Sequence, residues 1–387
     1  MQDSIWFRTL EEEDRRRLGE SDALPKTAEI VIVGAGMIGL ATAYYLSAEG
    51  ISDICVLDRE TALGEASGAN AGGLWFGQQS PQMGPLVPLA HASSRLYDDL
   101  AASGLAFDFR STGLLELLST EEDQERADQL LPAVRQNGFR AERIDRGQLH
   151  RLEPALGPGP AGAVFYADEA QLHPARLGAA LVRRLKNKKV KFCFHAEALR
   201  VAPRVATPGG EIDADIVVIA SGAWTPLVTR ALGWAPPIKP MRGQLLATGP
   251  QPALVRHTVI GRNFYHWQLA EGHVAGGGTV EDVGFQRGVD PQDVARIRSE
   301  MEELFPALGG VPIICAWSGF RPFCEDLKPV IGRVPGQERV YVAAGHFKKG
   351  IMLAPVTGKI LADLITSGRT DLPIEAFDPA RFGGRPQ

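Results

Sequence analysis

The chain is poor in cysteine, and it has no long apolar run and no large excess of charge of either sign. Only 4 of its 387 residues are cysteines, and they lack the CxxC spacing of zinc and redox sites. We therefore expect reduced structural thiols, no metal site and a cytoplasmic location. No apolar stretch approaches the ~18 residues of a membrane span. The charged residues 11–17 stand where a signal peptide needs its apolar region, so we expect neither a signal peptide nor an integral membrane segment.

The charge balance and the length limit the partners and the architecture. The formal net charge is −5, which gives no reason to expect a nucleic acid or an acidic membrane surface as partner. Apolar residues make up 44% of the chain, enough for a large core, and 387 residues predict two domains. The 43 glycines and 27 prolines are dispersed, as in a loop-rich α/β enzyme rather than a disordered chain.

The strongest functional signal lies in residues 29–39, which read EIVIVGAGMIG. An apolar, β-forming run passes directly into Gly34, Gly36 and Gly39, which is the G-x-G-x-x-G pattern after a buried strand. A helix is expected next, followed by a short strand that ends at Asp58. This acid stands about 20 residues after the last glycine, where a carboxylate binds a ribose hydroxyl. The order strand, glycines, helix, strand and acid predicts an adenine-dinucleotide site.

Each glycine has its own physical task in such a turn. Gly34 allows the tight turn, Gly36 lets the backbone approach a pyrophosphate, and Gly39 lets the helix pack closely on the strand. The helix N-terminus adds free N–H groups and the positive end of a dipole. These features fit NAD as well as FAD, because both carry the ribose that the acid would bind.

The α/β pattern returns twice further along the chain. An apolar strand at 216–220 runs into a glycine turn, and a strand at 340–344 precedes a helix at 351–365 that we expect to be interrupted near Pro355. Between these parts lie helices and short strands separated by glycine, which predict a mixed, largely antiparallel sheet. One of these helices opens at Thr120 with Asp123 three residues later, the pattern of a capping box.

The fold class is therefore α/β, with a Rossmann-like dinucleotide-binding domain interleaved with an α+β substrate domain. We assign residues 28–75, 171–235 and 325–370 to the first domain and residues 76–170 and 236–324 to the second. Residues 1–27 are expected to form a peripheral N-terminal extension with a short polar helix around 9–18, and residues 371–387 a C-terminal tail.

Several stretches together resemble the D-amino-acid oxidase superfamily of FAD enzymes, and glycine oxidase and sarcosine oxidase-like members in particular. They read GAGMIG at 34–39, GEASGANAGGL at 64–74, ADIVVIASGAW at 214–224, SGFRPFCEDLKPVIG at 318–332 and AAGHFKKGIMLAP at 343–355. The resemblance implies a glutathione-reductase-type domain that binds FAD rather than NAD. No cysteine stands where flavin-linked members of the family keep theirs, so we expect non-covalent FAD.

The resemblance also assigns cofactor contacts. Gly34, Gly36 and Gly39 would hold the pyrophosphate, Asp58 the adenosine ribose, and the helix that begins near Ile351 would face the flavin ring. The other residues expected to contact FAD are Met37, Ile38, Arg59, Ala66, Ser67, Ala71, Gly72, Gly73, Leu74, Ala198, Ser221, Gly222, Trp224, Gly345, Lys348, Lys349, Gly350 and Met352.

For the substrate, the family resemblance points to Arg321 and Tyr265 as ligands of a carboxylate. A guanidinium in an apolar strand needs a partner, and a carboxylate offers it a planar, bidentate match; a structural ion pair is the alternative for Arg321, and a core aromatic for Tyr265. The chain departs from glycine oxidases at His266 and Lys348, and we place both in the substrate pocket. This lysine has three candidate roles: oxygen activation, a second anion site, or a surface group.

The expected reaction is oxidation of the C–N bond of an amino or imino acid, by hydride transfer from Cα to flavin N5 and hydrolysis of the imine. The electron acceptor is O2 or a redox partner. The sequence leaves open whether the chain forms a homo-oligomer. Alternatives are an opine- or hydroxyproline-type dehydrogenase subunit, a hydroxy-acid oxidase, and a non-catalytic flavoprotein that binds partners.

Overall fold

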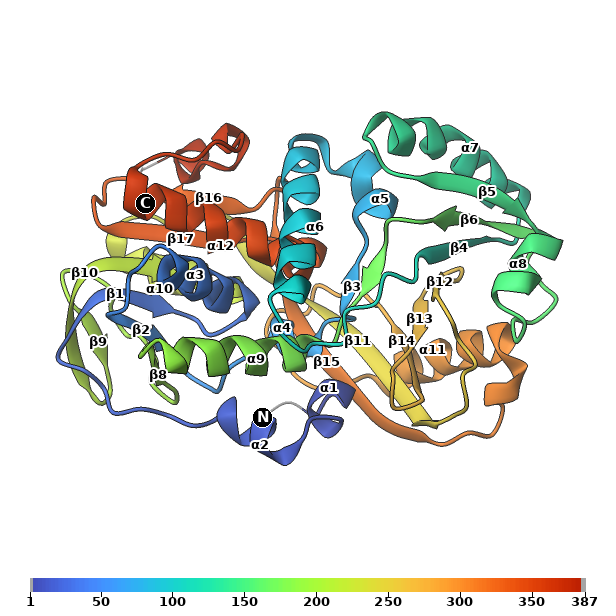
Figure 1. The fold of residues 1–387 in the computed structure, drawn as a ribbon, viewed down its shortest axis with the longest axis horizontal. Coiled ribbons are helices and arrows are strands. Elements are labelled where there is room, and N and C mark those ends of the chain that lie inside the picture. Colours follow the sequence, from blue (N-terminus) through green and yellow to red (C-terminus); the bar gives the residue numbers. More distant parts are fainter. Residues whose placement is uncertain (1–2, 384–387) are drawn as a thin grey trace.

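The computed structural model describes residues 3–383 and consists of two lobes, each built on a sheet (Figure 1). The first lobe contains a seven-stranded sheet in the order β16-β17-β10-β1-β2-β8, with β9 paired to β10. Its central strands are parallel, as the sequence predicts for a Rossmann-like domain, and β9 and β16 are antiparallel additions. The strands are β1 (Thr27–Val33), β2 (Ile54–Leu57), β8 (Lys191–Cys193), β9 (Val205–Thr207), β10 (Gly210–Ile219), β16 (Val330–Arg333) and β17 (Val340–Ala344).

The second lobe contains an eight-stranded sheet in the order β15-β11-β14-β13-β12-β4-β6-β5. All neighbours are antiparallel except β12 and β4, so the sheet is mixed and largely antiparallel, as predicted. A two-stranded sheet, β3 (Gly73–Leu74) with β7 (Ala170–Gln171), is separate from both. The strands are β4 (Leu114–Leu118), β5 (Ala141–Asp145), β6 (Gly162–Tyr166), β11 (Ile238–Pro250), β12 (Thr258–Ile260), β13 (Tyr265–Gln268), β14 (His273–Gly277) and β15 (Ile313–Cys324).

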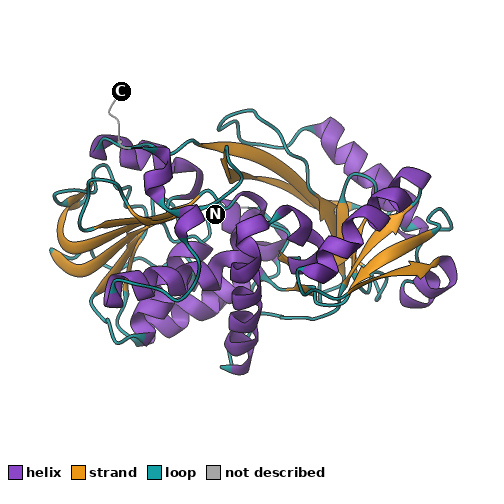
Figure 2. Ribbon diagram, turned by 90° about the horizontal axis from the view of Figure 1, so that it is seen from above, coloured by secondary structure: helices purple, strands orange, loops and turns teal. Residues whose placement is uncertain are grey.

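The main sheets lie toward opposite ends of the molecule, with helices packed between them (Figure 2). In the first lobe α3 follows the glycine turn and packs against α12, and α9 lies beside it. In the second lobe α7 begins with the predicted capping box of Thr120 and Asp123. The longer helices are α3 (Met37–Ala48), α6 (Val87–Ala102), α7 (Glu121–Gln136), α8 (Arg146–Leu152), α9 (Pro174–Asn187), α11 (Pro291–Leu304) and α12 (Gly350–Ser367).

Helix α12 is continuous, although we expected an interruption near Pro355. Proline has no N–H, so the carbonyl of Ile351 loses its usual helical donor. The hydroxyl of Tyr97 on α6 donates to that carbonyl instead, and Ser93 donates to the carbonyl of Met352 at 2.7 Å. The Tyr97 hydroxyl thus replaces the hydrogen bond that the proline removes, and Ser93 adds a second contact between α6 and α12.

The same helix is long and apolar enough to cross a membrane by length and composition, over Phe347–Ser367. In this structure 56% of its most apolar window is buried inside the protein. Its apolar character is that of a core helix packed against α3 and α6.

The N-terminal segment is not peripheral, and that expectation was wrong. Two short helices, α1 (Ile5–Arg8) and α2 (Glu12–Arg17), replace the single helix expected around 9–18, and Trp6 is only 2% exposed. Ser4 donates to the carbonyl of Gly68 at 2.7 Å, and the Trp6 indole donates to that of Asn70 at 2.6 Å. The N-terminal segment is therefore hydrogen-bonded to the small-residue loop at 64–74 and helps to fix its backbone.

The contact between α3 and α12 depends on a glycine. A Cβ added at Gly358 would lie 2.5 Å from the backbone carbon of Ala41. We predict that Gly358→Ala lowers the free energy of unfolding by about 1–3 kcal/mol, because overpacking outweighs the gain in helix propensity. Urea denaturation with saturating FAD measures the change. Gly159→Ala is the control, since nothing lies within 4 Å of a Cβ there; equal losses in both variants would contradict the packing argument.

Candidate active site

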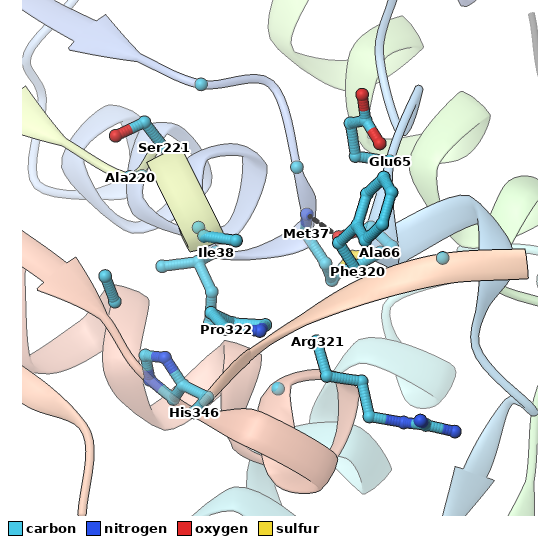
Figure 3. Close-up of a pocket in the computed structure, with 18 of the residues that line it drawn as sticks. Met37, Ile38, Glu65, Ala66, Ala220, Ser221, Phe320, Arg321, Pro322 and His346 are labelled. Atoms are coloured by element: carbon cyan, nitrogen blue, oxygen red, sulfur yellow. Dashed lines mark hydrogen bonds between the residues drawn. The ribbon is translucent and has the colours of Figure 1, made fainter. Parts of the chain in front are cut away.

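A cavity of about 410 Å³ opens where the central parallel strands of the first lobe end (Figure 3). Val33, Ala220 and Ala344 line it from the carboxyl ends of β1, β10 and β17. The crevice outside the carboxyl ends of the strands is where open α/β sheets bind their ligands. The cavity continues to β15 and β13 of the second lobe, so both lobes build it.

The glycine turn has the geometry that its pattern predicts. Gly34 has a φ of +116°, and a Cβ there would lie 2.4 Å from the carbonyl oxygen of Ala220. Gly36 lines the cavity, where a Cβ would approach the Ser67 hydroxyl at 3.2 Å. That hydroxyl accepts the N–H of Met37 at 2.9 Å, which ties the 64–74 loop to the start of α3. The turn thus presents bare backbone and a helix N-terminus to the cavity.

Asp58 lies on the cavity wall and also braces the glycine turn. Its carboxylate accepts the N–H of Ala35 at 2.8 Å and that of Glu60 at 2.9 Å. Burial raises the pKa of this carboxyl above its usual value. The acid expected to bind a ribose therefore helps to fix the backbone that would hold the pyrophosphate.

Most residues expected to contact FAD do line the cavity, although the contacts themselves stay a prediction. These are Gly34, Gly36, Met37, Ile38, Asp58, Arg59, Ala66, Ser67, Ala71, Gly73, Ala198, Ser221, Gly222, Trp224, Lys348, Gly350, Ile351 and Met352. Arg59 and Trp224 also meet each other, with the guanidinium 3.8 Å from the ring centre.

Five of the expected cofactor residues do not line the cavity but lie behind its wall. A Cβ at Gly39 would lie 1.9 Å from the carbonyl oxygen of Gly34, so this glycine serves packing, as the motif predicts. Gly72 and Leu74 belong to the segment that pairs with β7, Gly345 packs near Cys324, and Lys349 is the N-cap of α12.

His266 was expected in the substrate pocket, and the structure places it elsewhere. Side chains alternate along a strand, so Tyr265 lines the cavity while His266 points to the other face of β13. There it is fully buried, with its Nε2 3.6 Å from Glu300 on α11. A Cβ at Gly276 would lie 2.4 Å from its Nδ1, so β14 packs directly on the ring.

Arg321, Tyr265 and Lys348 line the same cavity, at its second-lobe end. Arg321 and Phe320 point to opposite faces of β15 (Figure 3). The Arg321 guanidinium donates to the carbonyl oxygens of Thr279 at 2.7 Å and Arg242 at 3.5 Å, and it lies against Gly243. Within residues 3–383 no carboxylate lies within 4.0 Å of it. Arg321 is therefore a half-buried cation that the described chain does not neutralise.

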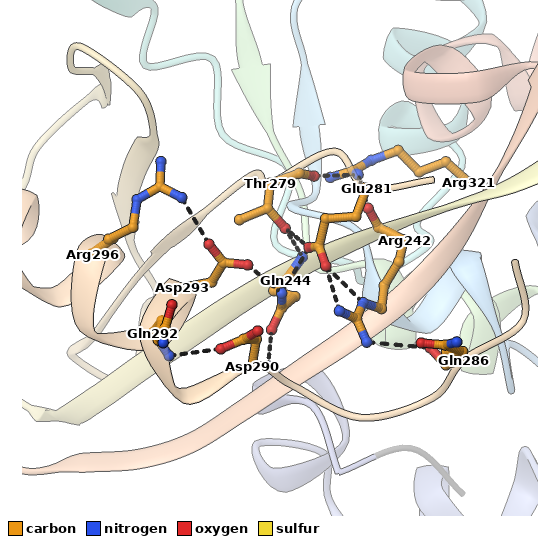
Figure 4. A network of polar contacts seen from close by, with 10 residues as sticks. All are labelled: Arg242, Gln244, Thr279, Glu281, Gln286, Asp290, Gln292, Asp293, Arg296 and Arg321. Atoms are coloured by element: carbon orange, nitrogen blue, oxygen red, sulfur yellow. Dashed lines mark hydrogen bonds and ion pairs between the residues drawn. The ribbon is translucent and has the colours of Figure 1, made fainter. Parts of the chain in front are cut away.

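A polar network fixes the carbonyl that Arg321 contacts (Figure 4). The Thr279 hydroxyl donates to Glu281 at 2.6 Å, and Arg242 donates to the other oxygen of that carboxylate at 2.9 Å. The buried amide of Gln244 joins Glu281 at 2.7 Å to Asp293 at 2.8 Å. The charges of this network are satisfied among themselves, which leaves Arg321 free of an acidic partner.

Other cavity residues were missed by the sequence analysis. The Trp75 ring meets that of Tyr265 at 4.8 Å, and Gly278 gives room for the same tyrosine. His346 donates to or accepts from Thr357 at 3.0 Å, and burial lowers its pKa to about 3, so it is neutral at pH 7. Only His346 has a local signal, since it lies inside the motif at 343–355; the others come together through the fold.

Comparison with known proteins gives consistent matches over nearly the whole chain. Residues 29–364 match the family model DAO, described as FAD dependent oxidoreductase. Glycine oxidase of Pseudomonas putida is 30% identical over 370 residues, which cover 92% of this chain and 97% of that protein. Hydrogen cyanide synthase subunit HcnC of Pseudomonas aeruginosa is 28% identical and covers 93% and 98%.

Solved structures are similar over the same extent. The crystal structure of glycine oxidase from Geobacillus kaustophilus has a TM-score of 0.88 and 27% identity, covering 92% of this chain and 99% of that one. L-proline dehydrogenase from P. horikoshii has a TM-score of 0.84 and 25% identity, with coverage of 93% and 98%.

The network beneath Arg321 generates a stability prediction. Gln244→Leu removes the buried amide that donates to both the Glu281 and the Asp293 carboxylates, and we expect a loss of about 1–3 kcal/mol in the free energy of unfolding. Gln292→Leu makes the same change at an exposed residue of α11 and should have little effect. Urea denaturation midpoints compare the two variants, and matching midpoints would show that the amide is dispensable.

Proposed function

The chain belongs to the family of FAD dependent oxidoreductases (DAO), and we propose that it oxidises the C–N bond of a small amino or imino acid held by Arg321 and Tyr265. It is an amino-acid oxidoreductase, and its cofactor is FAD. One observation carries the assignment of the substrate site: the Arg321 guanidinium, without an acidic partner in residues 3–383, shares a cavity with the glycine turn. A substrate carboxylate is the planar anion that it can bind through two N–H groups.

The residues present fit FAD along the whole cavity. At the Gly34 end, bare backbone and the N-terminus of α3 suit a pyrophosphate. At the Ala198 end, Leu199 and Leu227 line the cavity yet are 63% and 56% exposed, and a flat adenine would cover them. None of the four cysteines lines the cavity, which supports non-covalent binding.

When bound, FAD would supply the hydride acceptor, and the N-terminus of α12, whose residues Gly350–Met352 line the cavity, would stabilise the negative charge of the reduced cofactor. The chain contributes orientation. Arg321 holds the carboxylate, and the Tyr265 hydroxyl, which makes no hydrogen bond within residues 3–383, donates to it as well. Fixing the carboxylate at two points turns Cα–H toward the cofactor and removes orientational freedom from the reaction.

No side chain stands out as a catalytic base. The acids that line the cavity are Asp58, Glu65 and Glu197, and all three belong to segments around the glycine turn rather than to the strands of Arg321 and Tyr265. The substrate amine therefore has to arrive uncharged, and no proton is taken from it by the protein during hydride transfer. The imine then leaves and hydrolyses in water.

The electron acceptor gives a second candidate function. HcnC and L-proline dehydrogenase, among the similar proteins, are not called oxidases. Under this alternative the chain passes electrons to a redox partner rather than to O2. Hydrogen peroxide formed in air by the isolated holoprotein at the rate of substrate turnover supports the oxidase; turnover that needs an added dye supports the dehydrogenase.

The proposal is tested by mixing the holoprotein with amino and imino acids under nitrogen and following flavin absorbance. We expect bleaching by at least one such acid. A flavin that none of them, and no hydroxy acid, reduces would favour a non-catalytic flavoprotein, whereas bleaching by hydroxy acids alone would move the reaction to a C–O bond.

We predict that Arg321→Ala keeps FAD bound but lowers kcat/KM by a factor equivalent to about 2–5 kcal/mol, the cost of removing one partner of a charge-assisted contact. The control is Arg204→Ala, at an exposed arginine directly before β9. Flavin content and steady-state rates are measured for both. Turnover close to wild type in Arg321→Ala would remove this residue from the site.

A further inference from the structure

A second cation shares the cavity with Arg321 and has no task in the proposed function. Lys348, in the turn η6 (Phe347–Lys349), lines the cavity together with Arg321 and Tyr265 and is in part open to solvent. Within residues 3–383 its ammonium group has no carboxylate within 4.0 Å, and its closest ring is that of the adjacent Phe347, at 5.6 Å. The substrate end of the cavity therefore carries two positive charges.

The acids on the cavity wall do not balance these two charges. Asp58 is bonded to backbone N–H groups, and Glu65 pairs with Arg59 at 2.6 Å and with Arg287 at 2.5 Å. Glu197 is exposed beside Ala198, at the end where we expect adenine. A substrate with one carboxylate would neutralise Arg321 and leave Lys348 without an anion.

We propose that the substrate is an amino or imino acid with two anionic groups, of which Arg321 binds the one on Cα and Lys348 binds the other. The inference rests on the proposed function, because it takes Arg321 as the ligand of the first carboxylate. It narrows that function to diacids, such as amino and imino dicarboxylic acids.

The physical argument is electrostatic. Two like charges in one partly desolvated cavity repel, and each stabilises a bound anion more strongly than it would in water. Desolvation and the nearby Arg321 guanidinium lower the pKa of Lys348, and an anion beside the ammonium would oppose that shift. The side chains also differ usefully: the guanidinium is a fixed planar fork, whereas the lysine stem is flexible and can follow a second group at variable distance.

Lys348 has another candidate role, which is to balance the negative charge that the cofactor gains on reduction. The two roles predict different carboxylate binding by the oxidised enzyme. A balancing charge acts only after reduction and leaves the binding of carboxylates to the oxidised holoprotein unchanged. A second anion site acts before any electron moves.

The test titrates oxidised holoprotein with acetate, malonate and succinate and follows the flavin spectrum. We expect the wild type to bind at least one of the diacids about 10-fold more tightly than acetate, as one further charge-assisted contact allows. Lys348→Met should reduce that preference to about 3-fold or less, with acetate affinity little changed. Lys188→Met is the control, since Lys188 is exposed after α9 and does not line the cavity, and it should keep the preference.

The outcomes separate the inference from the proposed function. Equal affinity for acetate and both diacids in the wild type, or a preference that survives in Lys348→Met, overturns the second anion site. If acetate still binds in those cases and Arg321→Ala abolishes its binding, the proposed function stands. If no carboxylate perturbs the flavin and no amino acid bleaches it, the proposed function fails and the inference with it. The ratio of kcat/KM for aspartate to kcat/KM for alanine, measured for each enantiomer, should be lower in Lys348→Met than in the wild type.

Discussion

The hydrogen bond from Arg321 to the carbonyl oxygen of Thr279, at 2.7 Å, orients the cation that we propose as the substrate ligand. A carbonyl orients the guanidinium without neutralising it, so the positive charge stays available to a ligand. Glu281 forms a bridge with Arg242 on the strand next to β15, and its carboxylate accepts hydrogen bonds from Thr279, Gln244 and Arg242 rather than pairing with Arg321. This carboxylate therefore helps to fix the Thr279 segment and does not neutralise the arginine.

The strand that carries Arg321, β15, is also an element through which the two lobes contact each other. β15 packs on the short helix α4 (Ala66–Ala69): a Cβ at Gly319 would lie 2.5 Å from the Cβ of Ala69, and the Trp317 indole donates to the Ala69 carbonyl at 3.1 Å. The same loop is held from its other side by Ser4 and Trp6. The 64–74 loop is therefore in direct contact with β15, and the N-terminal segment packs on the same loop.

The parts that the sequence predicts well are those whose signals are local. The glycine turn, the apolar parallel strands and the capping box of Thr120 and Asp123 each depend on residues within one or two elements. The face of His266 instead depends on how β13 pairs with β14 and packs on α11. The burial of Trp6 has no signal in the sequence, because a helix of four residues is too short to show periodicity. The room that Gly243 makes for Arg321 exists only once β11 and β15 are paired.

A crystal structure of the FAD-loaded protein with bound acetate tests the central claim most directly. The account predicts the acetate carboxylate within hydrogen-bond distance of the Arg321 guanidinium, with the Thr279 carbonyl still bonded to the same arginine. It would be contradicted by a cavity in which Arg321 pairs with a carboxylate of its own chain, or in which acetate binds elsewhere on the wall.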